Sequence, residues 1–262
     1  MTPLERLERP FAQRGSRALL MPFLVAGYPD PDRFVELCVA AEASGADVLE
    51  IGLPFSDPIM DGPVIADATH EVLATGFRVD DALALLARVR ERCALPFVAM
   101  TYTNLAFQRG FARFAEQLVG AGAAGIILPD LSVEDADEHL EACRAHALAT
   151  IFIASQTSPP ARIASLAAVS TGFVYAASLL GVTGVRDQLN VNAKDLVAAI
   201  RSATDLPVAV GIGVSTPEHA AEVATYADGV IVGSAIVRAI RESDDPIASV
   251  GARIAALRAA LG

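Results

Sequence analysis

Lysine is nearly absent from this sequence, because Lys194 is the only one among 262 residues, and tryptophan does not occur. Lysine and arginine together number 20 against 31 aspartates and glutamates, so the formal net charge is −11. Without a basic stripe, we expect neither nucleic acid nor an anionic membrane surface as a partner. The N-terminus lacks the regions of a signal peptide, and no apolar run approaches the roughly 20 residues of a membrane span. We therefore expect a cytoplasmic protein.

Cysteine and histidine are also sparse, and neither is clustered. The three cysteines lie far apart in helix-like segments without metal or redox spacing, which predicts reduced core thiols: Cys38, Cys93 and Cys143. The histidines fall in predicted helices, where we expect them on the surface: His70, His139, His146 and His219. Metal-dependent aldolases need clustered imidazoles or carboxylates, so no metal site is predicted.

Short apolar runs alternate with amphipathic segments along the whole chain, a pattern typical of repeated strand–helix units. Eight runs are predicted to be strands: residues 18–27, 47–53, 96–102, 125–130, 149–154, 172–178, 206–211 and 228–232. The runs are almost continuously apolar, as expected for parallel strands covered on both faces. The sequence therefore predicts an α/β fold, a single (β/α)8 TIM barrel spanning residues 1–262.

The predicted helices exceed what eight repeats require. An extra N-terminal helix is predicted over residues 2–14, and two helical segments, 64–74 and 80–93, separate the second and third strands. One helix is predicted near 107–121, and another over 192–202 after a loop from 179 to 191. Ser132 with Asp135 has the spacing of a capping box.

The second predicted strand carries Glu50 in its middle and continues into a loop with Asp57 and Asp61. A buried carboxylate is costly unless it is paired or functional, and no predicted strand contains an arginine or lysine to pair with Glu50. Burial raises a carboxyl pKa, which would let Glu50 act as acid and base near neutral pH. For Asp61 the alternative is a helix N-cap. For Asp57, a turn or interface role is favoured over catalysis.

Glycines follow each of the last three predicted strands, where barrels commonly bind phosphate through backbone N–H groups and a helix N-terminus. They lie in the segments 181–184, 211–213 and 233–234. A Schiff-base mechanism needs a lysine inside the barrel, whereas Lys194 lies in a predicted helix. Together these features predict acid–base chemistry on a phosphorylated substrate, without a metal or a catalytic lysine.

Five segments, in order along nearly the whole chain, closely resemble the tryptophan synthase α-subunit family. They are residues 49–63 (LEIGLPFSDPIMDGP), 22–29 (PFLVAGYP), 173–175 with Ser178 and 181–184, 210–215 with 217–218, and 233–237. The resemblance implies retro-aldol cleavage of indole-3-glycerol phosphate to indole and glyceraldehyde 3-phosphate. The sequence departs from the family pattern at three positions: Ala66, Ser132 and Gln156, the last within residues 154–159. None of them is Glu50 or Asp61.

The resemblance also implies a role for each matching residue. Glu50 would protonate indole C3 and shuttle a proton from the glyceryl hydroxyl, and Asp61 would accept the indole N–H. Tyr175 would pack near the reacting carbons. The remaining positions are implied for phosphate binding (Gly184, Gly213, Gly233 and Ser234), the indole pocket (Phe23 and Tyr102), the closing loop (Thr183) and the partner-facing surface (Pro54 and Asp57).

The implied partner is a tryptophan synthase β subunit in an α2β2 assembly, with pyridoxal phosphate only on that subunit and no cofactor on this chain. Three alternatives remain at this point. The chain could be a free-standing lyase serving another pathway, a catalytically impaired subunit that activates a β-like enzyme, or another phosphate-binding barrel isomerase.

Overall fold

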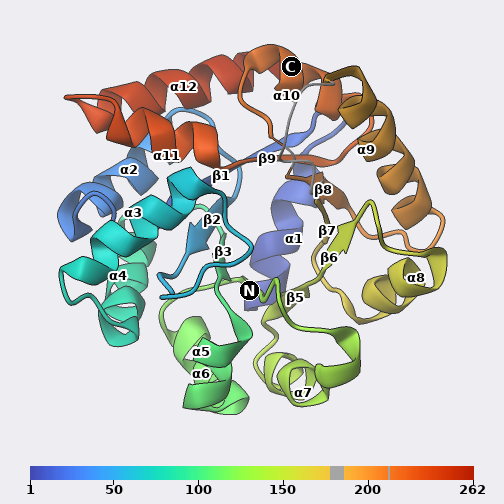
Figure 1. Ribbon diagram of the computed structural model, residues 1–262, viewed down its shortest axis with the longest axis horizontal. Coiled ribbons are helices and arrows are strands. Elements are labelled where there is room, and N and C mark those ends of the chain that lie inside the picture. The colour runs from blue at the N-terminus through green and yellow to red at the C-terminus, as the bar shows by residue number, and fades with distance from the viewer. Residues whose placement is uncertain (178–185, 212) are drawn as a thin grey trace.

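The computed structural model describes residues 1–177, 186–211 and 213–262; for residues 186–192 it describes the backbone only. Within these residues, nine parallel strands form one sheet in the order β5-β4-β3-β2-β1-β9-β8-β7-β6 (Figure 1). The strands are β1 (Leu19–Val25), β2 (Leu49–Gly52), β3 (Phe97–Met100), β4 (Gly125–Ile127), β5 (Ala149–Ile151), β6 (Ile153–Ser155), β7 (Val174–Ala177), β8 (Val208–Val210) and β9 (Gly229–Val232).

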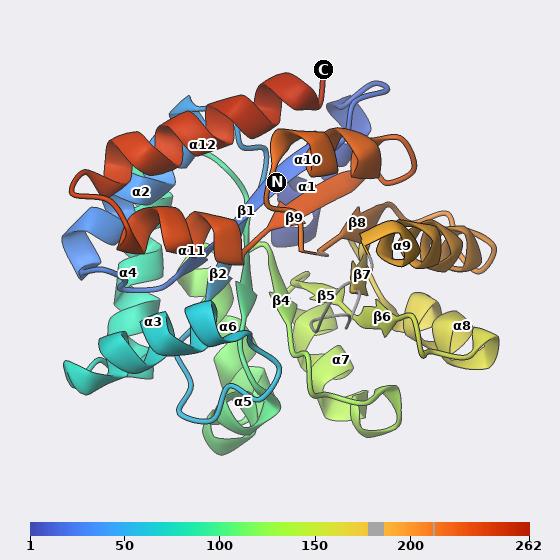
Figure 2. The ribbon, with the colours of Figure 1, turned by 45° about the horizontal axis from the view of Figure 1, so that its top comes forward.

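The two strands at the ends of that order, β5 and β6, are separated in the chain only by Phe152, so the sheet curls into a nearly closed barrel (Figures 1 and 2). This confirms the predicted barrel. The fifth predicted strand, 149–154, is interrupted and pairs with β4 on one side and with β7 on the other. The predicted count of eight therefore becomes nine.

In the part of the chain that the structure describes, twelve α-helices and one 3₁₀ turn accompany the strands. The elements are α1 (Pro3–Gln13), α2 (Pro31–Ala43), α3 (Pro63–Ala74), α4 (Val79–Arg92), α5 (Thr103–Arg109), α6 (Phe111–Gly120), η1 (Val133–Asp135), α7 (Asp137–Ala145), α8 (Pro160–Val169), α9 (Arg186–Arg201), α10 (Pro217–Ala224), α11 (Ser234–Arg241) and α12 (Pro246–Ala260). The extra N-terminal helix and the extra helices between strands are thus confirmed. None of the described helices has the length and apolar character needed to cross a membrane.

Three local predictions were wrong. The helix predicted over 107–121 is split into α5 and α6 at Gly110, whose φ of 81° lies in the region that favours glycine. Helix α9 begins at Arg186 rather than near 192, so the predicted loop was too long. The Ser132 hydroxyl donates to the Asp135 carboxylate (2.6 Å) ahead of a 3₁₀ turn, instead of capping an α-helix.

Buried side chains form two groups on opposite faces of the sheet. Alternation along β1 sends Leu19 and Met21 into the barrel interior and Leu20 and Leu24 toward the helices. Helix α1 lies in the middle of the ring in Figure 1 and adds Leu7 to the interior group. The outer group contains the cysteines, which are all buried and free, as predicted.

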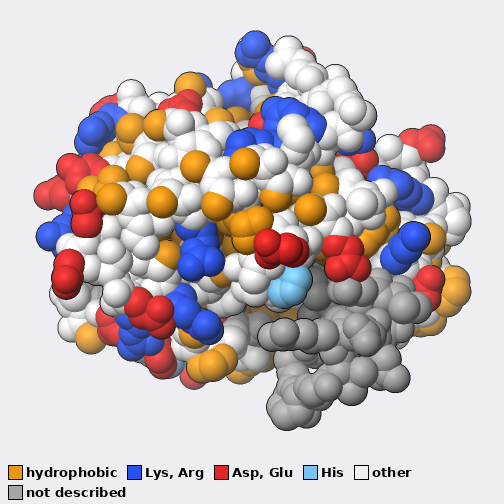
Figure 3. All heavy atoms as spheres, turned by 90° about the horizontal axis from the view of Figure 1, so that it is seen from above, with side chains coloured by type: hydrophobic (Ala, Val, Ile, Leu, Met, Phe, Trp, Pro, Cys, Tyr) orange, Lys and Arg blue, Asp and Glu red, His pale blue; other side chains and the backbone are white. Residues whose placement is uncertain are grey.

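Aspartates at the N-terminal ends of the strands join the helices to the barrel. Asp228 accepts the Val208 amide hydrogen (2.9 Å) and pairs with Arg14 and with Arg201 (3.1 Å). Asp47 accepts the Leu20 amide hydrogen and forms ion pairs with two further arginines, Arg17 and Arg258. On the exposed face shown in Figure 3, by contrast, basic side chains lie among acidic ones.

Replacing Asp228 with alanine should lower the free energy of unfolding by about 2–3 kcal/mol, because two arginines and a buried amide would lose their acceptor. Urea unfolding measures the change. Asp32→Ala is the matched control: it removes an ion pair with Arg88 in which the aspartate side chain is 84% exposed, and should leave stability unchanged within error. Equal losses in the two variants would contradict the proposed importance of Asp228.

Candidate active site

Glu50 lies in β2, in register with Phe23 of β1 and Val98 of β3. Its side chain is buried, and the carboxylate oxygen Oε2 has no hydrogen-bond partner among the described residues. Burial, together with the nearby charge of Asp61, raises the pKa of Glu50 to about 8. At neutral pH Glu50 therefore holds a proton that it can donate.

Asp61 lies in the loop between β2 and α3. It does not cap that helix, because Gly62 occupies the N-cap position and no side chain caps the helix, so the N-cap alternative is wrong. Burial raises the pKa of Asp61 to about 6, and a hydrogen bond from the Tyr102 hydroxyl opposes this rise. Asp61 is thus mostly ionised at neutral pH, when Glu50 is mostly protonated.

Tyr175 comes from β7, across the barrel from β2, and its side chain belongs to the interior group. Burial raises the pKa of its hydroxyl well above the ordinary value, and the charges of Glu50 and Asp61 raise it further. The barrel therefore brings together the three residues that the resemblance singled out. The Tyr175 hydroxyl lies so close to Gly211 that a Cβ atom there would be 2.0 Å from the hydroxyl oxygen.

A small cavity lined by both apolar and polar side chains lies beside Asp61. Phe23 and Tyr102, the two residues predicted for an indole pocket, line it together with Gly52, Leu53, Phe55, Ile65, Thr69, Met100 and Thr101. A Cβ atom at Gly52 would lie 2.5 Å from the tip of the Phe23 ring, so glycine is needed there to admit the ring. Sequence reasoning missed the packing roles of Gly52 and Gly211, although a glycine at a strand end is a signal of close approach.

The predicted phosphate positions are described only in part. Gly233 occupies the N-cap position of α11 and Ser234 opens that helix, and no described side chain caps its backbone N–H groups. The N-terminus of a helix is a common anion site. Gly233 also adjoins Phe23 and Ile65, so this helix end borders the cavity beside Asp61. Gly213 lies between β8 and α10 with a φ of 43°. Thr183 and Gly184 lie outside the described residues.

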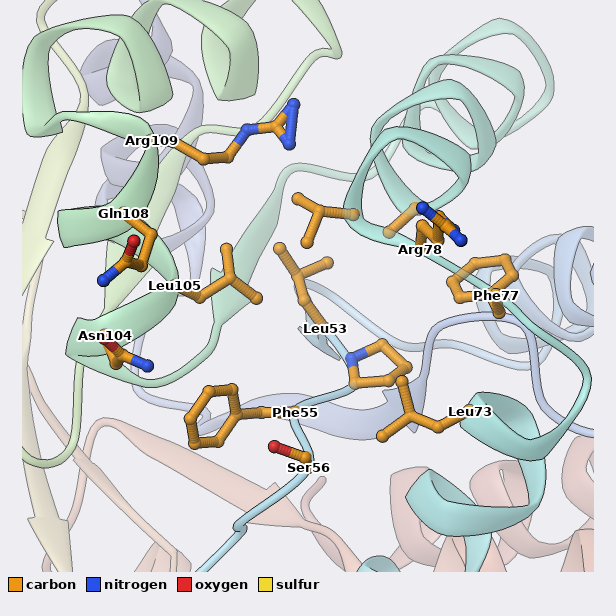
Figure 4. A pocket seen from close by; sticks show the side chains of 13 residues that line it. Leu53, Phe55, Ser56, Leu73, Phe77, Arg78, Asn104, Leu105, Gln108 and Arg109 are labelled. Carbon is orange, nitrogen blue, oxygen red and sulfur yellow. The ribbon is translucent and has the colours of Figure 1, made fainter.

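The predicted partner-facing residues lie in the segment that follows β2. Pro54 lines a second cavity of about 380 Å³, between that segment and helices α3, α4 and α5. In Figure 4, Leu53 and Leu105 point toward one another across this cavity, with Arg78 and Arg109 near its edges. Asp57 is exposed and accepts a hydrogen bond from the Ser56 hydroxyl (2.6 Å).

The histidine prediction was partly wrong. His139 is buried on α7 beside Phe111 and Cys143, and burial lowers its pKa to about 4. Asp137, Glu138 and Glu141 around it are acidic and exposed, so the sequence did not indicate that one side of this helix is buried. Among the residues that the structure describes, no group of three or more histidines, cysteines and carboxylates is placed to hold a metal ion. Lys194 is exposed on α9, outside the strands.

The fold and these residues define a class of protein: a (β/α)8 barrel enzyme with two carboxyl groups whose pKa values are raised to different extents, one of them beside a small pocket that holds aromatic rings. Residues 11–260 match the family described as tryptophan synthase alpha chain. The chain belongs to this family, whose members are lyases.

Individual relatives agree with this assignment. The tryptophan synthase alpha chain of Streptomyces coelicolor is 46% identical over 237 residues, covering 90% of this chain and 88% of the relative. That of Chloroflexus aurantiacus is 43% identical, covering 89% of each chain. Among solved structures, tryptophan synthase from M. tuberculosis in space group F222 has 41% identity and a TM-score of 0.90, covering 98% of each chain. Tryptophan synthase subunit alpha from Legionella pneumophila has 36% identity and a TM-score of 0.90, covering 100% of this chain and 98% of that one.

Replacing Gly211 with alanine should force the Tyr175 ring to move, because the added methyl group would overlap its hydroxyl and Cζ atoms. We expect a loss of about 1–3 kcal/mol in the free energy of unfolding, typical of overpacking. In a Tyr175→Ala background the same substitution should cost much less. Gly120→Ala is the control, because nothing lies within 4 Å of its Cβ position. Equal costs with and without Tyr175 would contradict the contact.

Proposed function

We propose that this chain cleaves indole-3-glycerol phosphate to indole and glyceraldehyde 3-phosphate, as the α subunit of tryptophan synthase in tryptophan biosynthesis. The observation that carries the proposal is the pair formed by Glu50 and Asp61 in a barrel of this family. Their pKa values of about 8 and about 6 give one proton donor and one anion near neutral pH. The aromatic side chains of Phe23 and Tyr102, in the small cavity beside Asp61, offer apolar faces to an indole ring.

The reaction breaks the bond between indole C3 and the first glyceryl carbon. Glu50 donates its proton to C3, and the positive charge that develops on the ring is stabilised by Asp61, which accepts the indole N–H. The glyceryl hydroxyl then loses its proton to the Glu50 carboxylate as the carbonyl forms. The electron pair of the broken bond returns to the ring, so indole leaves neutral and Glu50 recovers its proton.

The other residues orient the substrate. Tyr175 packs near the reacting carbons, and Phe23 and Tyr102 flank the indole ring. The phosphate binds at the N-terminus of α11, through Gly233 and Ser234, with Gly213, Gly184 and the loop of Thr183 completing its site. A helix N-terminus attracts an anion without lysine or arginine, which suits a protein with so little lysine.

No step above draws on a cofactor from this chain, and pyridoxal phosphate is proposed only for a β subunit that receives the indole. We place the docking surface for that subunit at Pro54, Asp57 and the cavity in Figure 4. Helix α5 lines this cavity and exposes 64% of Phe107. Exposed aromatic side chains beside an apolar hollow are typical of protein interfaces.

An indole-release assay tests the reaction. Glu50→Gln should lower kcat/KM by about 10²–10⁴-fold, because glutamine cannot transfer the proton. The wild-type kcat/KM should rise as Asp61 ionises near pH 6 and fall as Glu50 loses its proton near pH 8. The residual activity of the variant should lack the fall near pH 8.

Glu8→Gln, an exposed substitution on α1, is the control and should retain wild-type activity. Full indole release by Glu50→Gln would refute the mechanism. The assay should be run with and without a β subunit. Activity raised by that subunit supports the synthase role, whereas high turnover unaffected by it would indicate a free-standing lyase. Stimulation of the β subunit without any cleavage would indicate an activating subunit only.

Replacing Phe107 with alanine should weaken binding of the β subunit by about tenfold or more, as expected for an aromatic anchor at an interface. Calorimetric titration of the two subunits measures the dissociation constant. Because the side chain is largely exposed, folding should be little affected. Glu8→Ala on α1 should leave the affinity unchanged. Unaltered affinity in both Phe107→Ala and Asp57→Ala would show that the β subunit docks elsewhere.

A further inference from the structure

Among the described residues, the loop that carries Asp61 has few polar contacts with the rest of the barrel. Two of its backbone hydrogen bonds are internal, from the Ile59 amide to Asp57 and from the Asp61 amide to Pro58. Near its start, the Ser56 carbonyl lies 3.2 Å from the His70 ring of α3. At its tip, the side chains of Ile59 and Met60 are 80% and 44% exposed. The position of the loop tip therefore depends on the few contacts that join it to the barrel.

Tyr102, the N-cap residue of α5, contacts this loop through its hydroxyl group and its ring. Its hydroxyl oxygen accepts the Met60 amide hydrogen at 2.9 Å, and the hydroxyl group favours the ionised form of the neighbouring Asp61 carboxylate. Its ring stacks on Phe55 with centroids 5.0 Å apart and planes at 22°. The tyrosine itself is only 5% exposed and lies in the segment that joins β3 to α5. Its hydroxyl thus joins the loop tip at Met60, next to Asp61, to this buried segment.

We propose that Tyr102 is a positioning residue for Asp61: its hydroxyl holds the loop tip and keeps the Asp61 carboxylate ionised and aimed into the pocket. This goes beyond the role of its ring in lining the indole pocket, and it rests on the proposed function. A phenylalanine ring would line the pocket equally well, so the hydroxyl is the group that carries the inference.

The charge state of Asp61 gives this inference a measurable consequence. A hydrogen bond donated to a carboxylate favours its ionised form, whereas burial favours the protonated form. Both effects act on Asp61, with burial the larger, and the resulting pKa is about 6. Without the hydroxyl, only the effect of burial remains and the pKa of Asp61 rises. Since the reaction uses ionised Asp61, activity at acidic pH should be lost first.

The test is the pH dependence of kcat/KM in Tyr102→Phe. The acidic limb should move to higher pH by about one unit, so the variant loses several-fold more activity at pH 6 than at pH 8. Tyr226→Phe is the matched control. Tyr226 precedes β9, at the opposite end of the strands, and its replacement should leave the limb in place. If Tyr102→Phe lowers kcat/KM by the same factor at every pH, then Tyr102 only lines the pocket and the inference is overturned.

Two measurements do not depend on turnover. Carbon-detected NMR of the free protein should show the Asp61 carboxyl titrating at higher pH in Tyr102→Phe than in the wild type. Hydrogen exchange of the Met60 amide should be faster in the variant, because that amide loses its acceptor. If the wild-type chain releases no indole, the proposed function fails and these two readouts still decide the role of Tyr102. An unchanged titration and unchanged exchange would overturn it.

Discussion

The proposed chemistry depends on a buried carboxyl group, one oxygen of which has no hydrogen-bond partner among the described residues. Glu50 is placed on the barrel wall by β2, and the neighbouring strands offer it no cation. A charged carboxylate in that position would be costly, and the cost is avoided because burial raises the pKa to about 8 and the group stays protonated. The same burial that the fold must tolerate supplies an acid at neutral pH. Proton donation is therefore a consequence of where the barrel places this residue.

Two glycines leave space for the aromatic side chains that pack near Glu50. Gly52 ends β2 without a side chain, which leaves space for the Phe23 ring, and Gly211 does the same for Tyr175. Asp61 approaches from a loop rather than a strand. Its burial is less complete and a hydroxyl contacts it, so its pKa rises less. Two carboxyl groups thus divide the roles of acid and anion according to their surroundings.

Much of this architecture could be predicted from the sequence. Apolar runs of strand length predicted the barrel, and a carboxylate in one of them, followed by a second in its loop, indicated the pair for which we propose a catalytic role. Features set by single contacts could not be predicted. The interruption at Phe152 reflects pairing with different strands on either side. The burial of His139 depends on how α7 packs against Phe111, and the bond from Tyr102 to the Met60 amide joins residues 42 positions apart. Such contacts between residues far apart in the sequence cannot be predicted from residue types alone.

Acidic residues of the barrel differ in whether an arginine pairs with them. At the N-terminal ends of the strands, Asp47 and Asp228 each accept a backbone amide hydrogen and pair with arginines from α9, α12 and the segment after α1. Paired in this way, a carboxylate serves to join elements. Within β2, Glu50 has no arginine partner among the described residues, and burial raises its pKa. The distribution of arginine around the barrel thus separates carboxylates that stabilise the fold from Glu50, the proposed proton donor.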